Sequence, residues 1–351
     1  MSLTPLAAAT ALPRLSEFDT IIDARSEGEF DEDHLPGALN WPTLTNEERI
    51  FIGTTYKQVN AFEAKKRGAA LAARNIALHV ERDVIDKPKD WAPLVYCWRG
   101  GKRSGSLALI LDQIGFKVTL IEGGYKAFRA ALVDDIPRLV TTIDWRVICG
   151  TTGSGKTRLL QALAAQGAQV LDLEDLANHR SSVLGAIPGV AQPTQKRFDT
   201  LVWDQLRGFD ITRPVFVESE SKKVGNVAVP TSLIEAMRQS ICLNLVLSDD
   251  ERVLLLMEEY DFFVQNGEHF CERLDALVAS RGQAVVERWQ TMVRAGSIAP
   301  VVQELLTLHY DPVYLQSMRR NFKGFDETTP IALTDRSPRA MAKLASDVLA
   351  G

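Results

Sequence analysis

The sequence predicts an α/β protein built from two parallel-sheet domains, the second of which contains a long helical region. Its length of 351 residues exceeds the usual size of a single core. Short apolar runs typical of buried strands alternate with stretches of helical periodicity, as in a parallel sheet with crossover helices. The order of strand, glycine-containing loop and helix occurs twice, around residue 97 and again around residue 150. We therefore expect two domains, residues 1–138 and 139–351.

The first domain is predicted to alternate strands and helices around a helical insertion at about residues 43–91. Strands are expected at residues 20–23, 93–96 and 117–121, a turn at 34–38, and helices at 104–114 and 125–132, with one or two more at 58–79. Residues 134–137, which include a proline, predict a break, where one pattern of strands and helices ends before the next begins. This break places the domain boundary near Arg138.

The second domain is predicted to begin with a strand at residues 145–149 and to end in a helical C-terminal part. Further strands are expected at residues 169–173, 214–217, 241–247 and 331–334. Residues 249–320 have mainly helical periodicity, with interruptions expected at Gly267, Gly282 and Gly296. Strands that alternate with helices again predict a parallel sheet.

The composition predicts a globular protein with reduced cysteines. No run of eighteen or more apolar residues occurs, and no basic segment followed by an apolar one stands at the N-terminus, so we expect a cytoplasmic location and no membrane partner. The four cysteines lie far apart without a CxxC pair, which argues against a zinc site and a disulfide framework.

The formal net charge of -5 gives no basic excess of the kind that usually accompanies nucleic-acid binding. One local stretch is nevertheless basic, and its members are Lys57, Lys65, Lys66, Arg67 and Arg74. Two interpretations stay open for it: a solvated helix face, or a surface for the phosphate backbone of RNA.

Cys97 is the first residue after a predicted buried strand and opens a loop that leads into a helix. The loop continues with Trp98, Arg99, Gly100, Gly101, Lys102, Arg103 and Ser104. Backbone N–H groups, the helix N-terminus and three cationic side chains would favour a thiolate here. The two glycines would let the backbone curl around an anion. The alternative, a small buried apolar residue at a strand end, fits these neighbours poorly.

A Walker A pattern follows the first strand of the second domain. It consists of Gly150, Thr151, Thr152, Gly153, Ser154, Gly155, Lys156 and Thr157, and a helix follows it. Successive backbone N–H groups would cradle a diphosphate, and Lys156 would reach its oxygens. The Thr157 hydroxyl would hold Mg²⁺ if a metal binds.

Polar residues follow two other strands of this domain, where an open α/β sheet binds ligands. Glu218 and Glu220 end one strand, and Glu218 stands where a metal-binding or substrate-binding carboxylate is expected, although a solvated acidic loop is an open alternative. His179 and Arg180 follow another strand and are candidates for phosphate contacts. A lone histidine is equally compatible with a structural role.

The first domain resembles the rhodaneses. Residues 23–26 (Asp-Ala-Arg-Ser), residues 34–38 (His-Leu-Pro-Gly-Ala) and the Cys97 loop occur in that family's order. The resemblance implies that Cys97 carries sulfur or selenium as a persulfide-like adduct. It also implies that Asp23, Arg25 and His34 form a supporting framework rather than catalytic groups.

The fusion of both domains resembles the bacterial tRNA 2-selenouridine synthases across nearly the whole chain. The match includes residues 172–182 and 218–221, with Gly225 behind them, and departs from the expected pattern at Ser181, where a glycine is anticipated. The fold implied is a rhodanese-like parallel-sheet domain followed by a P-loop NTPase-like α/β domain with a helical C-terminal part.

This resemblance implies a transferase that replaces sulfur by selenium in the wobble 2-thiouridine of tRNA. The implied co-substrates are selenophosphate, from a selenophosphate-producing enzyme, and geranyl diphosphate, which would give an S-geranylated intermediate. Cys97, Lys156 and Glu218 are the expected catalytic residues. Trp98 or Tyr125 would stack on a base, and the basic stretch would contact the tRNA backbone.

Two other functions remain compatible with the motifs. A nucleotide-dependent tRNA sulfurtransferase would use the P-loop for ATP or GTP and Cys97 for persulfide transfer. A non-catalytic tRNA-binding module would need neither Cys97 nor Lys156, and the presence of both argues against it.

Overall fold

A computed structural model describes residues 3–350, which form two compact units. The first unit contains the described residues up to Arg138 together with Pro193–Arg207, and the second contains Leu139–Gln192 and the described residues from Gly208 onward. The sequence-based division placed residues 193–207 in the second domain. In the structure they pack with the first unit instead.

The first unit is built on a five-stranded sheet whose order is β1-β5-β4-β2-β3, with every pair parallel. The strands are β1 (Thr4–Ala7), β2 (Thr20–Asp23), β3 (Ala38–Asn40), β4 (Pro93–Tyr96) and β5 (Thr119–Glu122). The sequence predicted β2, β4 and β5 but neither of the short edge strands β1 and β3. Since β4 is central, the cysteine that follows it lies at the carboxyl edge of the sheet, where open α/β sheets bind ligands.

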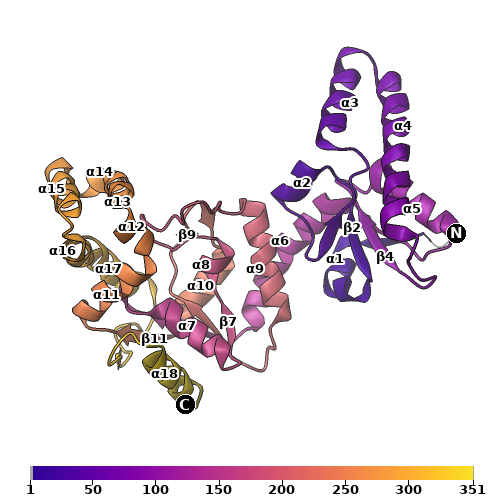
Figure 1. The fold of residues 1–351 in the computed structure, drawn as a ribbon. Helices are drawn as coiled ribbons and strands as arrows, with labels where there is room; N and C mark the ends of the chain where they lie inside the picture. The colour runs from indigo at the N-terminus through magenta and orange to yellow at the C-terminus, as the bar shows by residue number, and fades with distance from the viewer. Residues whose placement is uncertain (1–2, 351) are drawn as a thin grey trace. The chain divides into compact units, whose positions relative to one another are not determined.

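Helices complete the first unit. They are α1 (Ala8–Ala11), η1 (Leu12–Glu17), α2 (Glu27–Glu32), α3 (Asn46–Gln58), α4 (Ala61–His79), the π-helical turn η2 (Val80–Val84), α5 (Lys102–Ile114), α6 (Gly124–Thr142) and α9 (Gln195–Gly208). Figure 1 shows α3 and α4 side by side, extending away from the sheet. We call residues 46–79 the arm. Its apolar side chains Phe51, Tyr56 and Phe62 are exposed.

The break predicted at residues 134–137 is wrong, because α6 runs through Pro137 to Thr142. A proline inside a helix removes one hydrogen bond and strains the preceding turn. The side chains of Leu132, Ile136 and Val140 recur every four residues and are all buried. Their burial holds the helix together on both sides of the proline.

Helix α9 joins the first unit through contacts with α6. The Phe128 and Trp203 rings pack edge to face with centroids 5.8 Å apart, and the Trp203 indole N–H donates to Asp135 at 2.9 Å. Phe198 and Trp203 are almost completely buried. These contacts depend on residues separated by about seventy positions, so the periodicity of α9 alone does not predict them.

The second unit has a five-stranded sheet of order β12-β11-β6-β8-β7, also with parallel pairs, and a separate antiparallel pair. The strands of the sheet are β6 (Trp145–Cys149), β7 (Gln169–Leu171), β8 (Val215–Glu218), β11 (Ile241–Val246) and β12 (Ile331–Ala332); the pair is β9 (Lys223–Val224) and β10 (Val227–Ala228). All five predicted strands of this sheet are present. The α/β fold class is therefore confirmed.

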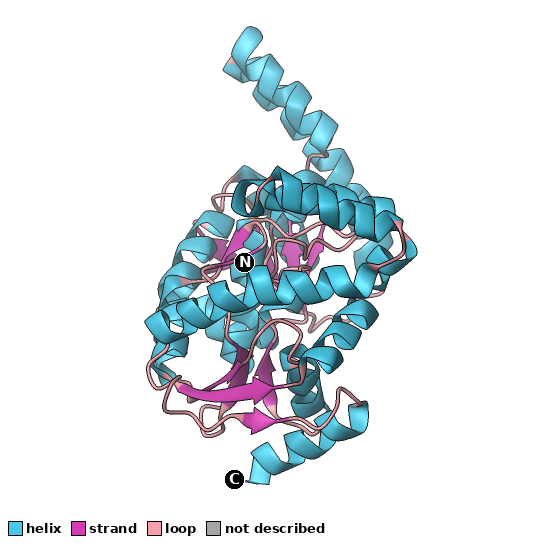
Figure 2. Cartoon of the chain, turned by 90° about the vertical axis from the view of Figure 1, so that its left-hand side faces the viewer, coloured by secondary structure: helices cyan, strands magenta, loops and turns pink. Residues whose placement is uncertain are grey.

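The helices of the second unit divide into those that come before, between or after the strands of the sheet and those of the helical C-terminal part. The first group is α7 (Lys156–Ala165), α8 (Leu173–Leu176), α10 (Thr231–Gln239) and α18 (Pro338–Ala350). The second group is α11 (Asp249–Glu259), α12 (Asp261–Gln265), α13 (Gly267–Leu274), η3 (Asp275–Leu277), α14 (Val278–Arg281), α15 (Gln283–Arg294), α16 (Ile298–Leu305), η4 (Leu306–Tyr310) and α17 (Asp311–Asn321). Figure 2 shows the strands flanked by helices and α18 at the C-terminal end.

The helical C-terminal part has an apolar core of its own. Trp289, Phe270, Leu274 and Val286 are buried together, whereas α7 and α18 cover the sheet through Leu159, Leu163 and Met341 in a different cluster. The predicted interruptions at Gly267, Gly282 and Gly296 coincide with helix boundaries. Among the described residues, no helix combines the length and apolarity that crossing a bilayer requires.

Candidate functional site

The Cys97 sulfur receives two hydrogen bonds at the start of α5. The Gly101 backbone N–H donates to Sγ at 3.3 Å and the Ser104 hydroxyl at 3.1 Å. The side chain is buried, and the N-terminal end of α5 adds its dipole. Two donors and the start of a helix therefore converge on this sulfur, in the place where the sequence predicted them.

The Cys97 loop is held against the first turn of α6. The Tyr125 N–H donates to the Cys97 carbonyl at 2.8 Å. Gly124 has φ +59°, and a Cβ there would come within 2.1 Å of the Cys97 carbonyl oxygen. Gly100 has φ +64° and also faces backbone atoms closely. A side chain at Gly124 would therefore displace the cysteine backbone.

The three cations of this loop do not act alike. Arg103 Nη1 pairs with Glu29 Oε2 at 2.6 Å, so its charge is compensated within the fold. Ser104 donates to the Cys97 sulfur, and a role of Arg103 and Ser104 in binding an anion stays a prediction. Arg99 and Lys102 are exposed, and no ion pair of either is found within residues 3–350. These two side chains remain candidates for binding an anionic substrate.

The expected supporting framework lies beside the loop. Arg25 and Asp23 form a fully buried ion pair at 2.6 Å, and Arg25 also donates to the Asp33 carbonyl at 2.6 Å. The His34 ring stacks on Phe30 with centroids 3.8 Å apart. These contacts agree with a structural role for all three framework residues.

Trp98 and Tyr125, the two candidates for base stacking, differ in their exposure to solvent. Tyr125 is buried, lies against the Arg25 guanidinium at 4.0 Å and donates its hydroxyl to Asp33 at 2.7 Å, so its predicted availability to a base is wrong. Trp98 is half-buried and rests on the Tyr125 ring with centroids 5.5 Å apart. Only Trp98 stays a candidate.

The P-loop connects β6 to α7 in the predicted context. Gly150, Gly153 and Gly155 have positive φ angles, and a Cβ on Gly155 would meet Met341 Cε at 2.4 Å. The Lys156 ammonium donates to the Gly150 carbonyl at 2.9 Å across the loop. The Gly150 N–H donates to the Tyr314 hydroxyl at 2.8 Å. The loop is thus closed on itself and fixed to α17.

A pocket opens over this loop. From the Walker A pattern it includes Thr152, Gly153, Gly155, Lys156 and Thr157, whereas Gly150, Thr151 and Ser154 do not line it. Arg180, Glu174, Glu218, Glu220 and Tyr260 also line it, within a volume of about 1210 Å³ that includes space open to solvent. Backbone N–H groups at a helix N-terminus bind phosphate oxygens, and this pocket offers them with a lysine.

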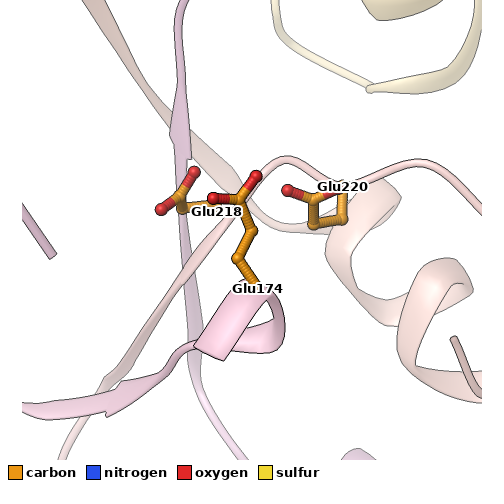
Figure 3. A group of neighbouring side chains, drawn as sticks. All are labelled: Glu174, Glu218 and Glu220. Atoms are coloured by element: carbon orange, nitrogen blue, oxygen red, sulfur yellow. The ribbon is translucent and has the colours of Figure 1, made fainter. Parts of the chain in front are cut away.

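Three glutamates meet at this pocket. One carboxylate oxygen from each of Glu174, Glu218 and Glu220 lies within 4.8 Å of the other two. Figure 3 shows Glu174 reaching from the short helix α8 toward Glu218 at the end of β8 and Glu220 in the loop beyond. The sequence predicted Glu218 and Glu220 but not Glu174. Its position directly after a neighbouring parallel strand is the signal that points to it.

Burial and mutual repulsion raise the pKa of each of these carboxyl groups to about 8. The Lys156 charge opposes this increase, as does a hydrogen bond between Thr157 and Glu218. Glu218 Oε1 is buried without a hydrogen-bond partner. Three carboxylates that share one lysine form a site short of positive charge.

Ser181 connects two of these glutamates. Its backbone N–H donates to Glu174 Oε1 at 2.6 Å, and its hydroxyl donates to Glu220 Oε2. Serine, at the position where glycine is anticipated, therefore supplies a side-chain hydrogen bond that glycine could not make. Since Ser181 has an ordinary negative φ, the position does not require glycine.

His179 and Arg180 have different environments. His179 is buried, burial lowers its pKa, and its ring lies behind Gly225, whose added Cβ would come within 2.7 Å of it. It does not line the P-loop pocket, so the structure adds no support for its predicted phosphate contact. Arg180 does line the pocket, with its guanidinium 5.2 Å from the centre of the Tyr260 ring.

Two family models match the chain. One, described as the tRNA 2-selenouridine synthase AAA domain, matches residues 143–277, and a rhodanese-like domain matches residues 8–131. Similarity to a solved structure, a rhodanese-related protein from Thermoplasma volcanium, gives a TM-score of 0.24 at 16% identity, covering 36% of this chain and 89% of that one.

Curated relatives named tRNA 2-selenouridine synthase are also similar. The protein from Pseudomonas syringae pv. tomato is 32% identical over 354 residues, covering 91% of this chain and 95% of the relative. The protein from Nitrosomonas europaea is 37% identical over 227 residues, covering 63% and 58%. This chain spans less than two thirds of the length of the Nitrosomonas europaea relative (58%) and of the Nitrosomonas eutropha relative (57%).

Proposed function

We propose that this chain, which belongs to the tRNA 2-selenouridine synthase family, replaces sulfur by selenium in the wobble 2-thiouridine of tRNA through an S-geranylated intermediate. The observation that carries the proposal is the presence, in one chain, of a hydrogen-bonded Cys97 sulfur and a P-loop pocket with Lys156. Selenophosphate from a selenophosphate-producing enzyme would supply selenium. Geranyl diphosphate would supply the alkyl group.

The P-loop serves the geranyl step. The thiocarbonyl sulfur of the base forms a bond to the allylic carbon of geranyl diphosphate, whose C–O bond breaks with its electron pair going to the diphosphate. The proton on N3 of the base passes to water. Lys156 and the amides of the loop stabilise the charge that develops on the leaving diphosphate. No nucleotide is needed for this step.

The Cys97 loop serves the selenium step. Selenium of selenophosphate attacks C2 of the base, geranylthiolate leaves and takes a proton from water, and hydrolysis of the P–Se bond releases phosphate. Cys97 acts either as the selenium carrier or as the group that positions the selenium donor. A selenium adduct on Cys97, detected by mass spectrometry of the protein, distinguishes the first role from the second.

The glutamate cluster fits a divalent cation such as Mg²⁺. Glu218 Oε1 is a buried oxygen without a partner, and carboxylate oxygens are the ligands that Mg²⁺ prefers. Glu174, Glu218 and Glu220, together with the Thr157 hydroxyl, would hold it. When bound, the ion would offset the charge of a diphosphate in the P-loop pocket.

The arm would bind the tRNA backbone. It carries Lys57, Lys65, Lys66, Arg67 and Arg74 together with exposed aromatic side chains, although Glu63 pairs with Lys66 and lies near Arg67. Reversing the charges of Lys65, Lys66 and Arg67 should weaken tRNA binding and reduce its dependence on salt, by roughly 0.7–0.9 logarithmic units of slope for each lost phosphate contact. Reversing Arg339 and Lys343, exposed on α18, is the control. Equal binding by both variants would eliminate the arm as the RNA surface.

The decisive experiment is incubation of the protein with thiolated tRNA, geranyl diphosphate and selenophosphate, followed by mass spectrometry of the nucleosides. We expect Lys156→Ala to lose the geranyl product by about 10²–10³-fold, the usual effect of removing one stabilising group of this kind. Cys97→Ala should accumulate that product and form little selenouridine. Lys343→Ala, at an exposed position, is the control.

The proposal fails if the wild type makes neither geranylated nor selenium-containing uridine. Nucleotide hydrolysis that tRNA stimulates, with sulfur transfer from Cys97, would instead support the sulfurtransferase. Binding of tRNA without any product would support a non-catalytic module.

A further inference from the structure

A second, apolar pocket adjoins the P-loop pocket within the second unit. Both pockets share Thr152, Ser182, Leu256, Tyr260 and Tyr310 as lining residues. Beyond these five, the second pocket is lined by apolar side chains alone: Leu184, Met257, Phe263, Val264, Phe270, Ile298, Val302, Leu305 and Leu306. It spans about 510 Å³, including space open to solvent, and we call it the chain pocket.

The chain pocket is fixed relative to the phosphate cradle. Arg252, buried on α11, donates from Nε to the Thr152 carbonyl at 2.9 Å and pairs with Asp311 at the start of α17. A Cβ added at Gly153 would lie 3.0 Å from the Leu256 side chain, so the P-loop runs directly against α11. The helical C-terminal part thus forms the wall of the phosphate site as well as the chain pocket.

We propose that the chain pocket holds the hydrocarbon chain of an isoprenyl diphosphate whose diphosphate lies on the P-loop. This inference rests on the proposed geranyl transfer and assigns the part of the protein that recognises the chain. A molecule with a charged head and an apolar tail matches two adjoining pockets, one with backbone N–H groups and Lys156 and one with apolar walls.

The polar groups of the chain pocket lie only where it joins the P-loop pocket. The Ser182 and Tyr260 hydroxyls are 3.3 Å apart there, and the Arg180 guanidinium faces the Tyr260 ring. Burial raises the pKa of the Tyr310 hydroxyl to about 12, so it stays neutral. An allylic carbon at this junction would have its diphosphate on the polar side and its chain on the apolar side.

The position of the polar groups, at the junction alone, also disfavours a nucleotide base in the chain pocket. A base carries several hydrogen-bonding groups, and each one buried without a partner is unfavourable. The nine side chains beyond the junction offer no nitrogen or oxygen to such groups. An acyclic hydrocarbon loses no hydrogen bond on entering and gains from leaving water.

The test is chain-length preference in a variant whose chain pocket is filled. Val302 lies on α16, lines the chain pocket and is only half-buried, so Val302→Trp adds volume with limited disturbance of the core. Gln303→Trp, one residue further on the same helix and outside both pockets, is the matched control. Dimethylallyl, geranyl and farnesyl diphosphates are each offered with thiolated tRNA, and the alkylated nucleosides are measured by mass spectrometry.

We expect Val302→Trp to lower geranyl transfer relative to dimethylallyl transfer by about tenfold or more, in the range that pocket size confers on apolar substrates. Gln303→Trp should keep the wild-type ratio. Inorganic pyrophosphate should bind both variants like the wild type, since the P-loop is unchanged. A Val302→Trp protein with the wild-type ratio of geranyl to dimethylallyl product overturns the inference.

A second variant serves if Val302→Trp does not fold. Ile298→Ala enlarges the chain pocket, and the ratio of farnesyl to geranyl product should rise. An unchanged ratio in that variant also overturns the inference. Failure of the proposed function looks different, because the wild type would then alkylate tRNA with none of the three diphosphates.

Discussion

The Cys97 loop and the P-loop occupy equivalent places in two parallel sheets, but the charges that surround them differ. Each follows a strand in the interior of its sheet and leads into a helix. Around Cys97, an N–H and a hydroxyl donate to one sulfur, and the buried or half-buried cations nearby are paired, Arg25 with Asp23 and Arg103 with Glu29, whereas the exposed Arg99 and Lys102 are not. Around the P-loop, the buried Glu218 and Glu220 and the half-buried Glu174 share the charge of Lys156.

This difference teaches that the strands beside the loop decide the chemistry as much as the loop itself does. In the first unit, the end of β2 contributes an ion pair that is complete without a ligand. In the second, the ends of β7 and β8 lead to carboxylates that repel one another. Ligands should therefore change the stability of the second unit more than that of the first.

The largest effect is expected from breaking the compensated pair of the first unit. Asp23→Ala leaves the Arg25 guanidinium buried without its carboxylate, which should lower the free energy of unfolding by about 3–5 kcal/mol. Calorimetry of the full chain measures this as a lower unfolding temperature of one transition. Asp31→Ala, at an exposed position on α2, should change stability by less than about 0.5 kcal/mol. Equally small losses of stability in Asp23→Ala and Asp31→Ala would show that the ion pair between Asp23 and Arg25 does not stabilise the fold.

An intermediate effect of opposite sign is expected from neutralising the uncompensated cluster. The pKa of Glu218 is about 8 in the folded protein and near 4.5 in an unfolded chain. Between those values the folded state binds more protons, so its stability falls as pH rises from about 4.5 to about 8 and is then constant. Glu218→Gln resembles the protonated form and should stabilise the protein at pH 8.5, by about 1–3 kcal/mol, but little at pH 5. Thermal unfolding of this variant and of Glu235→Gln, exposed on α10, measures the difference; an equal gain at both pH values would contradict it.

The same variant tests the cation. Mg²⁺ competes with protons for these carboxylates, so its stabilisation of the wild type should increase from pH 6 to pH 8.5. At a hundredfold excess over its Kd, the increase in stability is about 2.7 kcal/mol. Glu218→Gln should lose most of that gain, whereas Glu235→Gln should keep it. A gain that does not depend on pH or on Glu218 would place the ion elsewhere.

The sequence predicts those parts of the sites that consist of consecutive residues. The Cys97 loop and the P-loop are local patterns of strand, glycine and helix start, and both have the predicted form. Glu174 was missed because its role depends on β7 lying beside β8, which places two separate loops at one edge. Of the predicted pair, Arg180 lines the P-loop pocket and His179 does not, and the sequence gives no information on which way either side chain points.

The fold differs from prediction where distant packing outweighs local signals. Pro137 predicts a break, but buried side chains on both sides of it maintain α6. Helix α9 has the periodicity of any amphipathic helix, and its place in the first unit depends on Trp203 and Asp199 meeting residues of α6. The chain pocket likewise cannot be predicted from the sequence, since its walls come from α11, α12, α13, α16 and η4 together with the P-loop and the loop after α8.

The smallest effect concerns the serine that each site contains. Ser104 donates to the Cys97 sulfur, and Ser181 donates to Glu220, where the hydrogen bond opposes the rise in pKa that burial causes in that carboxyl group. Removing the Ser181 hydroxyl should cost about 0.5–1.5 kcal/mol at pH 8.5, where the carboxylate is charged. It should also move the midpoint of the pH-dependent stability upward, because the charged form of Glu220 loses a donor.

Comparing Ser181→Ala with Ser181→Gly separates the hydroxyl from the backbone. Both variants keep the N–H that donates to Glu174, and both should shift the midpoint upward by the same amount. Glycine should lose up to about 1 kcal/mol more at every pH, because it also increases the freedom of the unfolded chain. If the midpoint of neither variant moves, the Ser181 hydroxyl does not stabilise the charged cluster, and the similarity between the two serines is only geometric.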